Sequence, residues 1–411
     1  MHANANAVGD IVVDLPFIRE YKNGHIERFG RSSFVPASED PAANRGVATR
    51  DVVIDGDIGV SARLFLPSAA AATGRRLPIV VYFHGGSFCT GSAFSRVYHR
   101  YAASLAASAG ALLVSVEYRL APEYPVPAAY DDTWAALRWV ASLSDPWLAE
   151  HADPRRMFVA GDSAGGNIAY HTAVRASRDT MDIEGLVMVH PFFWGAERLP
   201  SEAAWAGVGM YTPEVLDKVW PFVTAGQAGN EDPRINPPEE EIASLKCRRV
   251  LVAVAEKDSL GDRARRLAAR MRDCAWTTGD NREVTLVEAE GEDHVFHLYS
   301  PLRATSKELM QSIAQFVNQS AALPSPPTSV LRPPPVLPAM EVQGKTRTYW
   351  ALSLPTRPFK TVLTSANLGS SNFTARTSLS IGRGKALSKT NYRSVSFAGG
   401  VRGSYVMMKN F

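Results

Sequence analysis

The chain has 411 residues, 45% of them hydrophobic and 21% charged, with a formal net charge of +3. This length suits one α/β catalytic domain with appendages, and the apolar fraction is ample for a large core. No stretch reaches about 18 consecutive apolar residues, and residues 1–20 lack the basic start and apolar segment of a secretory signal, so neither a membrane span nor a leader is expected.

The net charge combines two regions of opposite sign. Residues 323–411 carry twelve Lys and Arg and one acid, Glu341, which leaves 44 − 12 = 32 basic and 41 − 1 = 40 acidic residues, a net of −8, in the rest. Such a body has no electrostatic case for binding nucleic acid. Only three cysteines occur, without metal-ligand spacing. This pattern favours reduced thiols in an intracellular protein without a metal site. We expect it in the cytoplasm, with the nucleus as a second location.

The first part of the chain predicts an arm followed by sheet. Residues 11–28 mix aromatic, aliphatic and proline residues without a long period, and we expect residues 1–35 to form an apolar arm across the main domain. Two strands joined by a turn are predicted at 51–55 and 60–66. Residues 78–83 are fully apolar and predict a strand of the buried parallel type.

His84-Gly85-Gly86 follows that buried strand directly. Two adjacent glycines allow successive backbone N–H groups to point at one place, where they can stabilise the oxyanion that forms when an ester carbonyl is attacked. The alternative interpretation is a tight turn. We expect His84 to position this loop by hydrogen bonds.

Beyond this loop the pattern alternates between helix and strand. Helices are predicted at 98–109, 127–143, 262–272 and 302–317, and strands at 111–117, 157–160, 185–190, 249–255 and 284–288. Residues 195–232 break the pattern with irregularly spaced aromatic residues, and we interpret them as a helical cap inserted into the sheet. The alternation predicts an α/β fold with a mostly parallel central sheet and helices on both faces.

The strand at 157–160 leads into Gly161-Asp162-Ser163-Ala164-Gly165. A sharp strand-to-helix turn with this Gly-x-Ser-x-Gly pattern places the serine oxygen above the sheet, with glycines leaving room for the backbone. Alone, the motif is also compatible with a glycine-rich turn. We expect Asp162 to brace the turn.

The other catalytic partners follow the next strands. Asp258 comes directly after the strand at 249–255, and His294 comes after the strand at 284–288. The chain order Ser163, Asp258, His294 is the order of α/β-hydrolases. Histidine removes the serine proton, and a carboxylate fixes the histidine tautomer and stabilises its cation.

Other residues near these positions compete for the same roles. We interpret Asp262 as a helix N-cap, Asp293 as pointing elsewhere, and His297 as structural because it enters an apolar, helix-like run.

Four motifs resemble those of the hormone-sensitive-lipase-like branch of the α/β-hydrolases: His84-Gly85-Gly86, Tyr118-Arg119-Leu120-Ala121-Pro122-Glu123, Gly161-Asp162-Ser163-Ala164-Gly165-Gly166-Asn167, and Asp258 with His294. Within this branch, the segments 14–24 and 291–297 resemble plant carboxylesterases, a group that includes gibberellin receptors, tuliposide-converting enzymes and hydroxyisoflavanone dehydratases. The resemblance spans residues 10–320.

This resemblance implies an α/β-hydrolase fold with a helical cap, and a serine carboxylesterase that hydrolyses small esters through a covalent acyl-enzyme without a cofactor. It implies an oxyanion hole made by the N–H groups of Gly85, Gly86 and Ala164. It also implies that the arm and the inserted segment cover the pocket above the nucleophile. We expect this pocket to be lined by Phe17, Phe193, Trp194, Tyr211, Trp220 and Val295.

Two alternatives stay open within the group. Receptors of the group carry an aliphatic residue in place of the triad histidine, so His294 speaks against a receptor that binds a small molecule without chemistry. A dehydratase or transacylating enzyme is the second alternative, although Ser163 favours an esterase over the threonine found in some dehydratases. Ser87 replaces a third glycine that many relatives carry, and we expect little loss from it.

Residues 1–322 are thus predicted to form the hydrolase domain, and residues 323–411 a separate tail. The tail is rich in Pro, Ser, Thr and basic residues, a composition that predicts disorder. Residues 332–338 fit a polyproline recognition spacing, and whether the tail docks a protein partner stays open. The expected partner of the domain is a small-molecule ester, not nucleic acid or a membrane.

Overall fold

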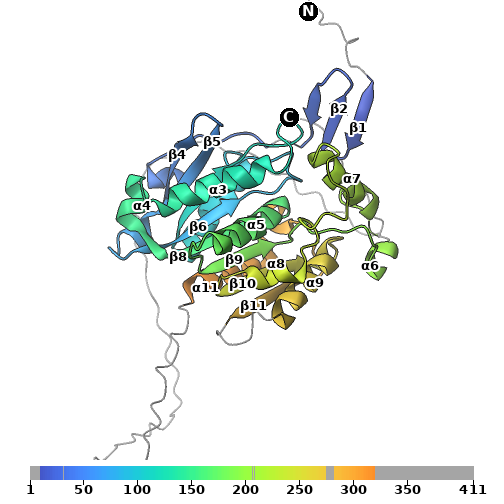
Figure 1. Cartoon of the computed structure of the whole chain (residues 1–411). Helices are drawn as coiled ribbons and strands as arrows, with labels where there is room; N and C mark the ends of the chain where they lie inside the picture. The colour runs from blue at the N-terminus through green and yellow to red at the C-terminus, as the bar shows by residue number, and fades with distance from the viewer. Residues whose placement is uncertain (1–9, 31, 206, 208, 275–281, 320–411) are drawn as a thin grey trace, which may run out of the picture. The chain divides into compact units, whose positions relative to one another are not determined.

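The computed structural model describes residues 10–30, 32–205, 207, 209–274 and 282–319 (Figure 1). The predicted tail at 323–411 lies outside the described residues. The strands are β1 (Ile11–Leu15), β2 (Ile18–Tyr21), β3 (Ile26–Arg28), β4 (Val47–Asp55), β5 (Val60–Pro67), β6 (Leu77–Phe83), β7 (Leu112–Glu117), β8 (Ala152–Asp162), β9 (Gly185–Val189), β10 (Arg249–Ala255) and β11 (Glu283–Ala289). The helices are α1 (Ser68–Ala71), α2 (Arg96–Ala109), α3 (Ala128–Ala141), α4 (Pro146–His151), α5 (Ala164–Arg178), α6 (Pro200–Ala203), α7 (Pro213–Val223), α8 (Glu239–Ser244), α9 (Gly261–Asp273), α10 (Phe296–Tyr299) and α11 (Ala304–Asn318), with a 3₁₀ turn at Pro41–Asn44.

The central sheet has eight strands in the order β11-β10-β9-β8-β6-β7-β5-β4. From β7 to β11 neighbouring strands are parallel, whereas β4, β5 and β7 pair antiparallel. The mostly parallel sheet predicted from the apolar runs is therefore confirmed. Because parallel strands end at the same edge, the segments that follow β6, β8, β9, β10 and β11 meet there.

Helices cover both faces of this sheet. In β6 the side chains of Ile79, Val81 and Phe83 join one hydrophobic core, while Val80 and Tyr82 join the other. Such alternation is what a strand buried on both faces requires. The first core includes residues of α3, α5 and α9, which lie in front of the sheet in Figure 1, and the second includes residues of α2 and α11.

The N-terminal arm forms regular structure instead of an irregular extension. Strands β1, β2 and β3 make a three-stranded antiparallel sheet. Its second turn passes through Asn23-Gly24, where Gly24 has a φ of +79° and the Tyr21 N–H donates to the His25 carbonyl at 3.0 Å. Phe17, Ile18 and Tyr21 are buried at 4%, 0% and 6% exposure. The arm is thus a small sheet with an apolar side.

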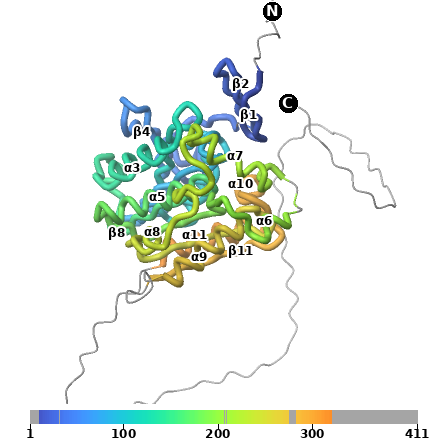
Figure 2. The backbone as a smooth tube through the Cα atoms, turned by 45° about the vertical axis from the view of Figure 1, so that its right-hand side comes forward, coloured from blue at the N-terminus to red at the C-terminus, as the bar shows by residue number. Residues whose placement is uncertain are grey.

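The segment between β9 and β10 carries α6, α7 and α8. Its main helix, α7, buries Leu216, Val219 and Trp220 completely. The small sheet and α7 lie side by side in Figure 1 and again in the rotated view of Figure 2. Among the described residues, no helix is both long and apolar enough to cross a membrane.

Candidate active site

Ser163 occupies a sharp turn between β8 and α5. Its φ of 52° and ψ of −119° belong to a backbone conformation that non-glycine residues rarely adopt. The Ser163 N–H donates to the Val189 carbonyl at 2.9 Å, and its carbonyl accepts the Phe192 N–H at 2.9 Å. A Cβ atom on Gly165 would overlap the Phe83 carbonyl oxygen. The two glycines of the motif therefore let α5 start directly against β6, and the strained serine is held from both sides.

Asp258 and His294 lie at the ends of adjacent strands. The parallel pairing of β10 and β11 places Ala255 beside Ala289, so the segments that follow both strands start together. His294 Nδ1 lies 2.7 Å from Asp258 Oδ2, and His294 Nε2 lies 2.9 Å from Ser163 Oγ. Since a carboxylate only accepts, Nδ1–H donates to Asp258 and Nε2 accepts the serine proton. The structure thus brings the three predicted residues into one hydrogen-bonded chain.

Burial and mutual attraction set the protonation states of Asp258 and His294. Burial raises the pKa of Asp258, but His294, with smaller contributions from His190 and the Leu260 N–H, leaves the pKa below its usual value. Burial likewise lowers the pKa of His294, but the Asp258 carboxylate, with smaller contributions from Asp162 and Asp293, raises it above 6.5. The carboxylate is therefore ionised beside a histidine that gains a proton more readily than usual, as a general base requires.

Among the described residues, the competing carboxylates and histidine make no hydrogen bond to the side chains of Ser163, His294 or Asp258. Asp262 pairs with Arg265 at 2.8 Å. The prediction that Asp262 caps its helix is wrong, because α9 begins at Gly261 with Leu260 as the N-cap residue. Asp293 accepts the His294 backbone N–H at 2.6 Å, and His297 is buried in α10.

The loop after β6 differs from the prediction at Gly85. The Gly85 N–H donates to the Tyr98 hydroxyl at 2.9 Å and to Asp162 Oδ1 at 3.1 Å. Asp162 also accepts from the hydroxyls of Tyr82 at 2.5 Å and Tyr98 at 3.0 Å. The prediction of Gly85 as an oxyanion donor is therefore wrong, because its N–H group is already used to fix the loop. Burial raises the pKa of Asp162 to about 6, so the carboxylate is charged above that pH.

The next N–H groups are better placed for an anion. Within the described part of the chain, the N–H groups of Gly86 and Ser87 donate no hydrogen bond. Gly86, Ser87 and Phe88 have φ angles of 115°, 53° and 61°, so three successive residues turn in the left-handed region. Such turns form anion-binding concavities. Ala164 opens α5, so its N–H has no acceptor in the helix and lies at the positive end of the helix dipole.

His84 supports this loop from below. Its Nδ1 lies 2.8 Å from the Gly85 carbonyl, and its ring stacks on Tyr118 at a centroid distance of 4.3 Å. The Tyr118 hydroxyl in turn donates to the His84 carbonyl at 2.7 Å. Burial lowers the pKa of His84 to about 4, so the neutral ring donates from Nδ1.

Three of the six expected pocket residues lie near the candidate site. The Tyr211 ring stands at 67° to the His294 ring with centroids 4.9 Å apart, and Phe17 of the arm contacts Tyr211 at 5.9 Å. The Tyr211 and Ser87 hydroxyls lie 3.4 Å apart. Val295 follows His294 directly. Tyr211 therefore packs on the His294 ring, and Phe17 of the arm packs on Tyr211.

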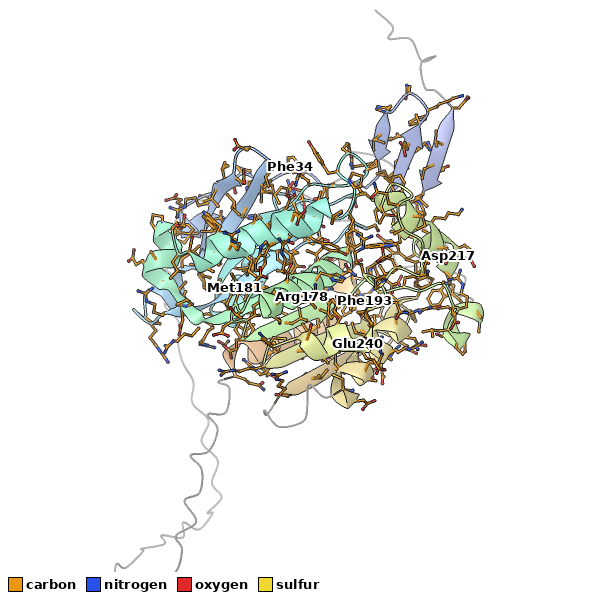
Figure 3. All side chains as sticks on the ribbon, in the orientation of Figure 1. Phe34, Arg178, Met181, Phe193, Asp217 and Glu240 are labelled. Carbon is orange, nitrogen blue, oxygen red and sulfur yellow. The ribbon has the colours of Figure 1, made fainter. Side chains whose placement is uncertain are left out.

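The other three expected pocket residues belong to the core. Trp194 and Trp220 have 0% exposure, and their Nε1–H groups donate to Asp217 and Asp232. A side chain without exposed area cannot face a solvent-filled pocket, so their assignment to the pocket is wrong. Phe193 is 3% exposed and packs edge-on against Tyr170. Figure 3 labels Phe193 among the packed side chains and Asp217 on α7.

Arg28 makes contacts with the loop after β6 that the sequence did not predict. Its Nε donates to the Cys89 carbonyl at 2.6 Å and its Nη2 to the Ala121 carbonyl at 3.0 Å. Its Nη1 donates to Glu123 Oε1 at 2.8 Å. The side chain is only 9% exposed. Arg28 thus ties β3 to the loop that carries Gly86 and Ser87, through partners about 60 and 95 residues away in the chain for which no local pattern exists.

A serine on a strand-to-helix turn, with an aspartate and a histidine after later strands of one parallel sheet, defines an α/β-hydrolase. A family model described as alpha/beta hydrolase fold matches residues 80–298, more than half of the chain.

Individual known proteins give a narrower family assignment for this chain. Probable carboxylesterase 3 of Arabidopsis thaliana is 39% identical over 315 residues, covering 74% of this chain and 96% of that protein. The 2-hydroxyisoflavanone dehydratase of Glycyrrhiza echinata is 42% identical over 320 residues, covering 74% of this chain and 94% of that protein. The solved structure of EstE1, a thermostable carboxylesterase from a metagenomic library, is 27% identical with a TM-score of 0.58, covering 69% of this chain and 90% of its own. The chain belongs to the α/β-hydrolase family, as a carboxylic ester hydrolase of the plant carboxylesterase group in the hormone-sensitive-lipase-like branch.

Proposed function

We propose that this protein hydrolyses small carboxylic esters through a covalent acyl-enzyme on Ser163. The observation that carries the proposal is the chain from Ser163 Oγ to His294 Nε2 at 2.9 Å and from His294 Nδ1 to Asp258 Oδ2 at 2.7 Å. A serine hydroxyl is a weak nucleophile unless a base takes its proton, and a base in this position makes it reactive.

Acylation begins when Ser163 Oγ attacks the ester carbonyl carbon. His294 Nε2 takes the hydroxyl proton, and Asp258 stabilises the imidazolium that forms without taking its proton. The carbonyl oxygen becomes an oxyanion, which accepts hydrogen bonds from the N–H groups of Gly86, Ser87 and Ala164. As the tetrahedral intermediate collapses, the C–O bond to the alcohol breaks and His294 returns the proton to the leaving oxygen.

Deacylation repeats these steps with water. His294 takes a proton from a water molecule as the water oxygen attacks the acyl carbon. The second intermediate is held by the same N–H groups, and its collapse breaks the bond to Ser163 Oγ. The carboxylic acid leaves, and the serine hydroxyl regains its proton from His294.

Access to this chemistry is set by the cover over the site. Ser163 is 4% exposed, and Tyr211 and the arm residue Phe17 pack above His294. An ester therefore needs the cover to move before it reaches Oγ, and parts of the ester remote from the carbonyl contact the cover after it closes. Such remote contacts contribute binding energy that a small acetate lacks.

The test is hydrolysis of p-nitrophenyl acetate by the full chain and by Ser163→Ala and His294→Ala. Both variants are expected to lose at least about a thousandfold in kcat with the fold intact. A fluorophosphonate should add once to the wild type and not to Ser163→Ala, as read by intact mass. Near-normal turnover in either variant would reject the proposal. Because one relative is a dehydratase, elimination from a 2-hydroxyisoflavanone is measured alongside.

A further inference from the structure

The end of β9 and the residues that follow it hydrogen-bond to the backbone of Ser163 and to the backbone of Val295, the residue after His294. The Val189 carbonyl accepts the Ser163 N–H, and the Phe192 N–H donates to the Ser163 carbonyl, each at 2.9 Å. Between them, His190 Nδ1 accepts the Val295 N–H at 3.0 Å. Val295 directly follows His294, so a four-residue segment fixes the backbones of Ser163 and His294 relative to each other.

The Val295 N–H is a sensitive point in this arrangement. Val295 has a φ of +48°, which is a rare conformation for a β-branched residue. A strained backbone of this kind persists only where the surrounding structure fixes it. The Val295 N–H and the His294 carbonyl belong to the same peptide plane. A hydrogen bond to that N–H therefore fixes the orientation of the peptide plane next to His294, and with it the direction of the His294 side chain.

His190 is held rigidly enough to act as this acceptor. Its own φ is +48°, and its N–H donates to the Ala253 carbonyl of β10 at 2.8 Å. The ring is 1% exposed and packs on Phe296 and His297, each with centroids 5.5 Å apart. One nitrogen of His190, one nitrogen of His294 and one oxygen of Asp258 all lie within 4.8 Å of one another.

The hydrogen bond from the Val295 N–H also determines which nitrogen of the His190 ring carries the proton. Because Nδ1 accepts, the proton of neutral His190 lies on Nε2, which has no partner within the described residues. Burial lowers the pKa of His190 well below its usual value, the neighbouring His297 and His294 lower it further, and only Asp258 acts in the opposite direction. A neutral His190 brings no second positive charge next to the Asp258 carboxylate, which accepts from His294 Nδ1 through Oδ2.

We propose that His190 is a positioning residue for the esterase reaction, which orients His294 through the Val295 N–H. The inference rests on the proposed function of His294 as the base. The competing interpretation is that His190 is an ordinary core side chain, which most buried histidines are. His297 provides the contrast, because it is equally buried, contacts His190 and has no hydrogen-bond partner for either ring nitrogen among the described residues.

The first experiment compares His190→Leu and His190→Asn with His297→Leu as the matched control. Asn and Leu have nearly the same shape, but only Asn places an acceptor where Nδ1 stands. With p-nitrophenyl acetate, we expect His190→Leu to lower kcat roughly 10–100-fold with little change in KM, the range that a small misplacement of a catalytic group produces. His190→Asn should recover kcat to within about threefold, and His297→Leu should leave it within about twofold, since it removes no hydrogen bond.

These outcomes separate positioning from packing. Full kcat in His190→Leu, or equal losses in the Leu and Asn variants at similar melting temperatures, would overturn the proposal. A measurement on the wild type decides the matter if the Leu variant does not fold. With ¹⁵N-labelled histidine, Nδ1 of His190 must be unprotonated and Nε2 protonated; a protonated Nδ1 contradicts the proposal. Because this spectrum needs no turnover, a protein without Ser163-dependent hydrolysis would reject the proposed function and leave the tautomer result standing.

Discussion

Replacing Asp258 with Asn tests the candidate acid with almost no change in shape. The Asp258 side chain is 1% exposed; Oδ1 accepts the Leu260 N–H at 2.9 Å, and Oδ2 accepts from His294 Nδ1 at 2.7 Å. If the Asn oxygen keeps the bond to Leu260, its NH₂ group faces Nδ1. Nδ1 must then accept, which moves the imidazole proton to Nε2, the atom that faces Ser163. In that tautomer His294 cannot take the serine proton.

The expected loss follows from this wrong tautomer. The same change in another serine hydrolase lowers kcat about 10⁴-fold, and we expect roughly 10³–10⁴ here, equivalent to about 4–5.5 kcal/mol at 1.36 kcal/mol for each factor of ten. Asp262→Asn is the matched control. The Asp262 side chain is 42% exposed and forms an ion pair with Arg265 in the same helix, an interaction worth about 0.3–0.5 kcal/mol. Its other hydrogen bond is to Ser201, outside the Ser163–His294–Asp258 set, so kcat should stay within about twofold.

The assay is kcat for p-nitrophenyl acetate across pH, with the melting temperature of each variant. In the proposed mechanism His294 is a base only when it is unprotonated, and Asp258 holds its pKa above 6.5. Wild-type activity should therefore rise with pH through a value above 6.5. In Asp258→Asn the carboxylate is gone while burial still lowers the pKa, so the residual activity should rise at lower pH. An Asp258→Asn enzyme within tenfold of the wild type, or a larger loss in Asp262→Asn, would show that the reasoning is wrong.

Three further predictions concern the loop, the arm and the tail. Gly86→Ala should lower kcat about 10²–10³-fold, as loss of one oxyanion donor does, because the added Cβ would overlap Thr90. Gly30 also has a positive φ but has open space around it, so the control variant Gly30→Ala should keep its kcat. Equal kcat in both variants would contradict this prediction. Deleting residues 1–22 should reduce kcat/KM strongly for a long-acyl or aromatic ester and mildly for acetate; an equal loss for both, with a lower melting temperature, would make the arm a structural cover. Truncation after Ala322 should leave kcat/KM for a small ester within about twofold, and loss of folding or of most activity would show that the tail supports the domain.

Most of the large sheet could be predicted because its strands carry their own signal. Apolar runs such as 78–83 and 249–255 read as buried parallel strands, and the structure places β6 and β10 there. The small sheet of the arm was missed because its strands are short and partly exposed, so neither a helical nor an alternating period develops. The Asn23-Gly24 pair is a strong hairpin signal and could have predicted the turn between β2 and β3.

The candidate site could likewise be predicted only in part. The positions of Ser163, Asp258 and His294 follow from strand ends, since a parallel sheet gathers the segments after its strands at one edge. The one-residue error at Gly85 has another origin, because the N–H of Gly85 is taken by Asp162 and by Tyr98 of α2. Which N–H group stays available depends on side chains distant in sequence. The misplaced Trp194 and Trp220 arose because aromatic bulk fits a core and a pocket equally well.

The hydrogen bonds of Arg28 link the order of the arm to the state of the active site. Arg28 joins β3 to the Cys89 carbonyl, two residues beyond Ser87. Coupling between two sites is reciprocal. The folded arm stabilises the loop conformation by some free energy. An inhibitor that stabilises the same loop conformation therefore stabilises the folded arm by the same free energy. A phosphonate on Ser163 should therefore slow proteolytic cleavage of residues 10–30, and cleavage of the arm would then report whether Ser163 carries an inhibitor.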